Sequence, residues 1–311
     1  MAVEQEECTP WIFTAEQLDN TPSRQDGINK ADELAQRKSV CRMIEEVGKT
    51  IRPRVSPVAT NSAKVFFHRV FMAQSLSRQN AKLVGVTCLF VACKSEECLR
   101  PLRQFIWSLN TIETDPVTSR RTYPYGRGKN PERPAEIEED TKAFQDVRAN
   151  ILSMERVVLE ILGFEFNVDH PTVYLPRLVK FFDTVRRDKE TRCLITMDED
   201  GKNPAPSELG QKVLTTANGM ANDCNSTMLC LQFKGVTLAA CTLTLALRME
   251  GFKIQKMAKW EALLNQEWAK DIDPRFSAVS VKKEEIEEAC SQLLDLYDEA
   301  EVAAKQKGEA A

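Results

Sequence analysis

One stretch of the sequence ends a long apolar run in a group of charged residues. Residues 83–97 read LVGVTCLFVACKSEE, so about three helical turns of apolar residues come before Lys94, Glu96 and Glu97. A helix that is apolar all round belongs at the centre of a bundle, and charges at its end must reach the surface at one particular place. Lys94 is therefore a candidate for contact with another molecule. The alternative is a lysine that only extends from the end of a core helix, where its charge meets the helix dipole.

A second charged residue lies among residues that face the core. Glu155 is found within residues 153–158, SMERVV, on a later helix. Taken alone, Glu155 is best explained as a structural residue, whose carboxylate lies at the rim of the core and pairs with a nearby arginine. The occurrence of Lys94 and Glu155 on two core helices of one bundle favours a shared role in binding.

No known catalytic arrangement accompanies these charges. The sequence has no phosphate-binding loop, no dinucleotide-binding glycine motif, no GxSxG motif and no HExxH motif. His68 and His170 are the only histidines, and they fall on separate predicted elements, which leaves little for nucleophile-and-base catalysis. We expect a binding protein that is not an enzyme and has no cofactor.

Cysteine usage and charge exclude further classes of function. Of the ten cysteines, several fall in apolar helical patterns, where a free cysteine behaves as a small hydrophobic residue, and no CxxC pair occurs. We therefore expect no metal site and a reducing compartment. The formal net charge of −4 argues against direct nucleic-acid binding through a basic surface. The acidic first residues do not resemble a secretory signal, and no apolar run approaches the ~20 residues of a membrane span, so a soluble intracellular protein without membrane contact is expected.

The pattern of apolar residues predicts helices along the chain and a repeat between its halves. Residues 236–250, VTLAACTLTLALRME, repeat the buried run at an offset of 154, which aligns Arg248 with Lys94. The spacing of apolar residues and the cap residues predict five helices before residue 165 and five after it. We predict an all-α fold of two tandem five-helix bundles. The predicted helices are 33–47, 56–76, 81–97, 101–110, 140–162, 171–187, 206–227, 233–250, 256–270 and 282–305.

These helices divide the chain into four parts. Residues 1–32 form an N-terminal arm, 33–165 the first bundle, 166–305 the second bundle and 306–311 a tail. The first bundle carries an insertion at 113–136 that is rich in proline, glycine and basic residues. Such a composition is typical of a surface loop.

Several motifs resemble those of the cyclin family. Residues 83–97 together with 154–164, MERVVLEILGF, look like a cyclin box. Residues 11–24, WIFTAEQLDNTPSR, and 67–72, FHRVFM, are similar to segments of the transcriptional cyclins of the T and K type. In the second half, residues 222–232 and 292–297 look closest to the K type, so we predict a cyclin of that type.

The resemblance implies a function and roles for individual residues. It implies a regulatory subunit that binds and activates a transcriptional cyclin-dependent kinase, of the twelve/thirteen type, that phosphorylates the C-terminal domain of RNA polymerase II in the nucleus. The residues implied in kinase binding are Lys94, Glu155, Phe90, Phe164 and Glu97. Those implied in the structure of the box itself are Arg37, Leu83 and His68.

Two alternatives stay open. One is a T-type cyclin that pairs with cyclin-dependent kinase nine. The other is a two-bundle transcription factor of the TFIIB type, which would need a basic surface and commonly carries a zinc ribbon before the bundles; the net charge of −4 argues against it. The role of the insertion at 113–136 and that of the second bundle are not predicted.

Overall fold

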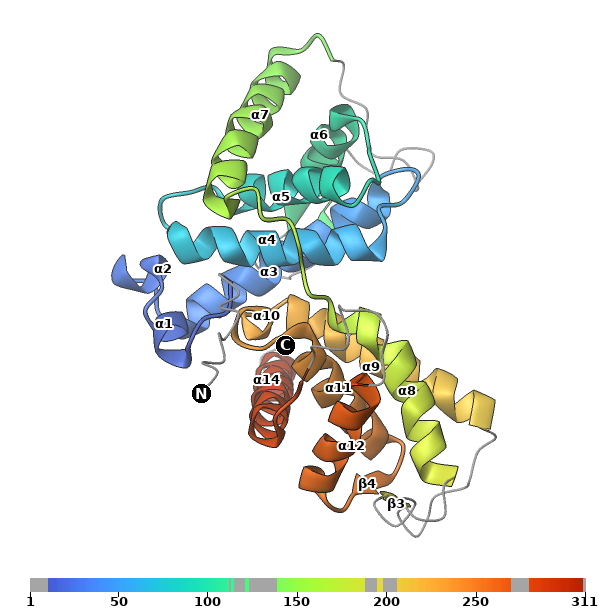
Figure 1. Ribbon diagram of the computed structural model, residues 1–311. Coiled ribbons are helices and arrows are strands. Elements are labelled where there is room, and N and C mark those ends of the chain that lie inside the picture. Colours follow the sequence, from blue (N-terminus) through green and yellow to red (C-terminus); the bar gives the residue numbers. More distant parts are fainter. Residues whose placement is uncertain are drawn as a thin grey trace, which may run out of the picture. The chain divides into compact units, whose positions relative to one another are not determined.

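The chain folds as helices grouped into two compact units (Figure 1). The first unit comprises residues 1–168 and 225–232, and the second comprises 169–224 and 233–311. The predicted all-α fold is confirmed, with short two-stranded ribbons as its only strands in the part of the chain that is described. The structure is a computed structural model that describes residues 11–111, 113–114, 121–122, 139–187, 195–197, 206–269 and 280–309.

The first unit is built around one fully apolar helix. The helix α5 (Ala81–Ser95) packs against the four other long helices of this unit. Gly85 permits the close approach of α3, because a Cβ atom there would lie 2.6 Å from a methyl group of Val40. The bounds of the other four helices are α3, Lys30–Thr50; α4, Pro57–Ala73; α6, Leu102–Thr111; and α7, Lys142–Leu162.

Capping residues in the sequence set the ends of these helices. The hydroxyl of Ser56 accepts a hydrogen bond from the Ala59 amide, and Pro57 occupies the first position of α4. Asn80 caps α5 and Thr141 caps α7 in the same way.

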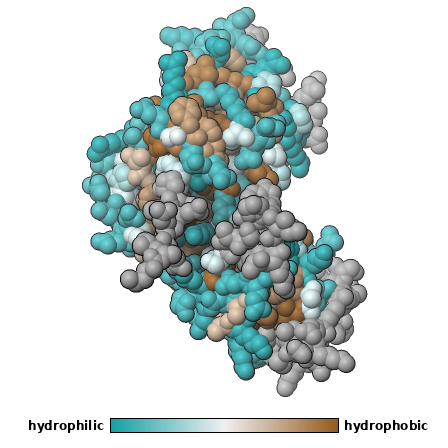
Figure 2. Space-filling model, viewed as in Figure 1, coloured by the Kyte–Doolittle hydropathy of each residue, from teal (hydrophilic) through white to brown (hydrophobic). Residues whose placement is uncertain are grey.

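Figure 2 shows polar residues over most of the visible face of the molecule, with apolar residues gathered where α6 and α7 lie in Figure 1.

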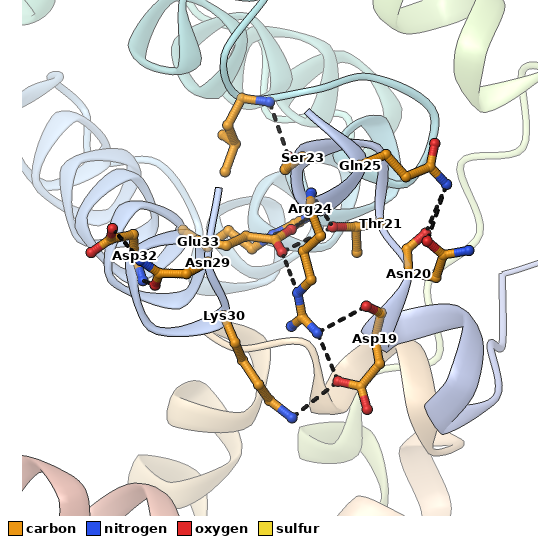
Figure 3. A network of polar contacts seen from close by, with 12 residues as sticks. Asp19, Asn20, Thr21, Ser23, Arg24, Gln25, Asn29, Lys30, Asp32 and Glu33 are labelled. Atoms are coloured by element: carbon orange, nitrogen blue, oxygen red, sulfur yellow. Dashed lines mark hydrogen bonds and ion pairs between the residues drawn. The ribbon is translucent and has the colours of Figure 1, made fainter. Parts of the chain in front are cut away.

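Two short helices of the predicted N-terminal arm lie on the first unit. They are α1 (Ala15–Asp19) and α2 (Pro22–Gln25). Arg24 points between two carboxylates, donating to Asp19 at 2.7 Å and to Glu33 at 3.0 Å (Figure 3). Thr21 is fully buried and its hydroxyl donates to Glu33 at 2.9 Å. This network attaches residues 15–25 to the first turn of α3.

Part of the predicted insertion is described. Residues 113–114 (β1, Glu113–Thr114) pair antiparallel with 121–122 (β2, Arg121–Thr122). The remainder of 113–136, apart from these four residues, lies outside the described residues.

The second unit repeats the arrangement around a second apolar helix. The helix α11 (Gly235–Met249) packs against α8 and α14. A Cβ atom at Gly235 would lie 2.2 Å from the Asp169 carbonyl oxygen, so α11 can begin there only with glycine. The other elements are α8, Pro171–Arg187; α9, Pro206–Asn225; α12, Met257–Ala269; α14, Lys283–Glu309; and the antiparallel ribbon of β3, Ile195–Met197, with β4, Phe252–Ile254.

A short segment between α9 and α11 belongs to the first unit. It contains α10 (Leu229–Gln232), which packs against α4. The Leu231 carbonyl accepts a hydrogen bond from the Phe13 amide at 2.8 Å, and the buried Lys64 ammonium donates to the Ser226 hydroxyl at 3.2 Å.

In the described ranges, no helix is both long and apolar enough to cross a bilayer.

Candidate functional site

The end of α5 is joined to the C-terminal half of α7 by an ion pair between the two residues singled out in the sequence. The Lys94 ammonium lies 2.6 Å from a carboxylate oxygen of Glu155. The Lys94 side chain is 45% exposed and that of Glu155 is 14% exposed. The pair therefore lies at the surface, where a partner can approach the lysine from solvent.

The aromatic ring of Phe90 contacts the ammonium group of Lys94 in this pair. Its ring centroid lies 4.2 Å from the Lys94 ammonium, a distance at which the face of an aromatic ring attracts a cation. The ring itself is buried and meets Phe105 edge to face at a centroid distance of 5.2 Å. In this structure Phe90 holds Lys94 in place and presents little surface of its own.

The backbone takes an uncommon conformation at the end of each of these two helices. Among the described residues, Glu97 and Phe164 are the only non-glycine residues with positive φ, at 53° and 59°. A left-handed conformation costs an L-residue about 1–2 kcal/mol. At Glu97 this conformation belongs to the turn that ends α5, in which the Cys98 amide donates to the Cys93 carbonyl at 3.0 Å. Glu97 and Phe164 are both among the five residues implied in kinase binding.

Phe164 is the largest of the exposed apolar side chains among the described residues. It follows Gly163, which ends α7 at φ 58°, and 68% of Phe164 is accessible to solvent. Its ring meets that of Phe166 edge to face at 6.2 Å, and Phe166 in turn contacts Phe66 at 6.0 Å. The ring of Phe164 thus packs on Phe166, which is itself anchored in the first unit.

Arg69 fixes the segment that carries Phe164. Its guanidinium donates to the carbonyl oxygens of Glu165 at 3.2 Å and Asn167 at 3.1 Å. It also lies over the ring of Trp11 at 5.1 Å. Burial lowers the pKa of Arg69 to about 10, which leaves it charged at neutral pH. The position of Phe164 therefore depends on α4 as well as on α7.

The other predicted residues of this surface lie as follows. Glu97 is exposed, beyond the end of α5, and its amide bonds the Lys94 carbonyl at 3.3 Å. Glu96, its neighbour, instead accepts from the Ser62 hydroxyl at 2.7 Å. Sequence reasoning missed Leu99, which is 69% exposed in the loop after α5. The sequence feature that could have pointed to Leu99 is its isolated position between Cys98 and Arg100, in a segment too short to form a helix that would bury it.

Arg37 lies inside the first unit, in a buried ion pair. Both Arg37 and Glu33 have fully buried side chains, and their closest nitrogen–oxygen distance is 2.8 Å. Arg37 also donates to the Phe71 carbonyl at 2.8 Å, and thereby links α3 to the end of α4. Leu83 is partly buried in the first turn of α5 and packs against the same core. These placements are those of residues that hold the first bundle together.

His68 is fully buried beside two cationic side chains. Its ring faces Arg37 at 3.4 Å and the Cys41 thiol at 3.4 Å, and Lys64 lies nearby. Burial, and after it the charge of Arg37, lowers the pKa of His68 well below 6.5, although a hydrogen bond with the Asn225 backbone opposes the shift. His68 is therefore neutral in the folded protein.

This burial makes stability depend on pH. Below pH 6.5 the unfolded chain binds a proton at His68 that the folded protein does not bind, so the free energy of unfolding must fall as the pH decreases. We expect His68→Gln to remove up to about 1.4 kcal/mol per pH unit from the slope between about pH 7 and 5.5. Urea denaturation across this range measures the slope. His170 is present in both proteins, so its contribution cancels, and equal slopes would contradict the prediction.

Nothing in the described part of the chain indicates a metal centre. No three His, Cys, Asp or Glu side chains of the described residues lie close enough together to hold a metal ion. Burial raises the pKa of the Cys41 thiol to about 12, which keeps it protonated. Lys94, Glu155, Glu97, Leu99 and Phe164 offer charge, hydrogen bonds and apolar area, which are the means of binding a protein partner.

Comparisons with known proteins identify the family. Residues 10–167 match the family model for the cyclin N-terminal domain. Cyclin-T1-4 of Arabidopsis thaliana is 30% identical over 308 residues, which cover 98% of this chain and 47% of that protein. Mouse cyclin-T2 is 27% identical over 294 residues, which cover 93% of this chain and 32% of that protein. The chain thus spans about half or less of the length of these curated relatives.

Solved structures share the fold. A chain of the CAK complex of Chaetomium thermophilum bound to ATP-gamma-S aligns with a TM-score of 0.56 and 15% identity, covering 92% of this chain and 76% of that one. A chain of the yeast RNA polymerase II CTD kinase CTDK-1 complex aligns with a TM-score of 0.56 and 12% identity, covering 91% and 83%. The relatives named above are T-type cyclins, and the family model covers just over half of this sequence. The chain belongs to the cyclin family.

Proposed function

We propose that this chain binds a transcriptional cyclin-dependent kinase and activates it to phosphorylate the C-terminal domain of RNA polymerase II in the nucleus. Cyclins are regulatory subunits of kinases and not catalysts. Relatives of the T type and a fold shared with a chain of an RNA polymerase II CTD kinase complex support a role in transcription.

The observation that carries the proposal is the Lys94–Glu155 pair between α5 and α7, together with the exposed Phe164 that follows α7. A half-exposed lysine of α5 is held between a carboxylate of α7 and an aromatic ring, and the segment that follows α7 carries the exposed ring of Phe164. Packing within the chain does not account for the exposure of the Phe164 ring. A partner that covers the ring and bonds the lysine accounts for it.

The proposed mechanism is positional. A protein kinase requires a strand lysine to pair with a glutamate of its C helix before the phosphates of ATP are correctly placed. The cyclin surface would hold that helix inward: Lys94 and Glu155 would bond polar groups of the kinase, Phe164 would pack against it, and Phe90 would position Lys94. The chain would supply no catalytic group of its own.

Two types of kinase are candidate partners of this chain. The T-type relatives favour cyclin-dependent kinase nine, whereas the likeness of residues 222–232 and 292–297 to K-type cyclins favours a kinase of the twelve/thirteen type. The full chain is to be mixed with each purified kinase, and phosphorylation of a polymerase C-terminal-domain peptide is then measured. Activation of one kinase assigns the pairing. No binding to either would refute the proposed function.

A charge swap tests whether the ion pair contacts the kinase. Lys94→Glu places two carboxylates together and is expected to weaken kinase binding by about tenfold or more. Lys94→Glu with Glu155→Lys restores an ion pair within the chain, so thermal stability should return to that of the unmodified protein. Kinase activation should not return, because the charges now face the wrong groups of the partner. Recovery of activation in the double variant would assign the pair a purely internal role.

A further inference from the structure

The second unit contains an open pocket of about 540 Å³. It lies between α9, α11 and α14, and apolar side chains from all three helices line it: Met220, Leu245 and Leu294. Leu294 is 42% exposed, and Met249, at the end of α11, is 69% exposed. A volume of this size accommodates several side chains of a peptide or a small ligand.

Gly219 lies in the wall of this pocket, and the chain's own packing does not require a glycine there. It lies within α9, where glycine is less favourable than alanine. A Cβ atom at Gly219 would meet nothing within 4 Å. By contrast, added Cβ atoms would collide at Gly85 and Gly235, and Gly163 has a positive φ. Among the described glycines of residues 11–269, only Gly219 combines open space with an ordinary φ. Glycine at such a position permits the close approach of a molecule from outside.

Arg248 supplies a charge at the edge of the pocket. It occupies on α11 the position that Lys94 occupies on α5, at the offset of 154. Lys94 is paired with Glu155, whereas the exposed Arg248 guanidinium makes no ion pair or hydrogen bond with the described residues. The nearest carboxylate of the lining, Asp223, accepts from the Tyr297 hydroxyl at 2.9 Å. With respect to the described residues, the pocket thus presents an unpaired cation beside an apolar wall.

We propose that this pocket binds a short peptide segment of a partner protein that combines apolar side chains with a carboxylate. The apolar side chains would lie over Gly219 against Met220, Leu245 and Leu294, and the carboxylate would pair with Arg248. Charge complementarity selects an acidic segment over a basic one. This site is in the second unit and is formed without Lys94, Glu155 or Phe164, so it is independent of the kinase-binding proposal.

The test selects peptides and then blocks the pocket. A phage-displayed library of random peptides is to be selected on the full chain, and the enriched peptides are synthesised with a fluorescent label. Gly219→Leu fills the pocket, and Arg248→Gln removes the cation. Gly219→Ala and Gly210→Ala form a matched pair on the same helix, because an added Cβ at Gly210 would make only an ordinary contact with Val179 at 3.6 Å.

We expect the enriched peptides to be apolar and acidic. Their Kd for Gly219→Leu and for Arg248→Gln, measured by fluorescence anisotropy, should be higher by a factor of about ten or more than their Kd for the unmodified chain. Gly219→Ala should also weaken binding, whereas Gly210→Ala should not. Neither alanine variant should melt at a lower temperature than the unmodified chain, since alanine favours a helix. The proposal is overturned if no peptide is enriched over the bare support. It is equally overturned if the peptides bind Gly219→Leu or Arg248→Gln as tightly as the unmodified chain.

Discussion

Replacing Glu33 by leucine is expected to lower the free energy of unfolding by about 3–5 kcal/mol. The substitution leaves the guanidinium of Arg37 fully buried without its carboxylate. It also removes the acceptor for the Thr21 hydroxyl and for Arg24, and so detaches α1 and α2 from α3. Urea denaturation of the full chain measures the loss.

The two members of the buried pair should not be equivalent. In Arg37→Met, Glu33 keeps hydrogen bonds from Thr21 and Arg24, so the remaining charge is still neutralised. We expect this variant to be less destabilised than Glu33→Leu. The double variant Glu33→Leu/Arg37→Met should also be more stable than Glu33→Leu alone, because it leaves no unpaired buried charge.

The chain offers a matched control on the same helix. Lys49 and Glu45 form an ion pair of the same spacing at 2.7 Å, but their side chains are 53% and 31% exposed. Lys49→Ala should therefore cost no more than about 1 kcal/mol. A cost for Glu33→Leu as small as that for Lys49→Ala would show that burial does not strengthen the Glu33–Arg37 pair.

This contrast also shows what the sequence can and cannot predict. Both pairs are four residues apart on α3, and nothing in the spacing separates a buried pair from an exposed one. The central helices α5 and α11 were predictable because they are apolar all round. The end of α7 was predictable because Gly163 suits a left-handed residue. By contrast, α1, α2 and α10 have only five, four and four residues, too few for the spacing of apolar residues to predict a helix, although Thr14 caps α1 and Thr21 caps α2.

The candidate site was predictable in part, for a similar reason. Lys94 and Glu155 were identified separately, since charged residues next to core positions are conspicuous in a sequence. Their direct contact spans 61 positions along the chain, which no local pattern specifies. The left-handed conformations of Glu97 and Phe164 were not predictable, because residues of these types rarely adopt positive φ. The burial of Phe90 likewise follows from its packing on Phe105, which is a tertiary contact.

Phe164→Ala is expected to weaken kinase binding by about 2 kcal/mol or more, which is about 30-fold in Kd, while the protein stays folded. The ring is 68% exposed, and its described ring contact within the chain is with Phe166, so little core packing is lost. In the complex the same ring would become buried, and aromatic anchors of this kind carry much of the energy of an interface. Titration calorimetry with the kinase that the chain activates measures the change.

A matched substitution separates this effect from a general loss of exposed apolar area. Val173, on α8 of the second unit, is 56% exposed and lies on an element that takes no part in the proposed kinase surface. Val173→Ala should leave the Kd unchanged, and both variants should melt within about 2 °C of the unmodified chain. Equal losses of affinity in the two variants would argue against a specific anchor. Unchanged affinity in a folded Phe164→Ala protein would remove Phe164 from the interface.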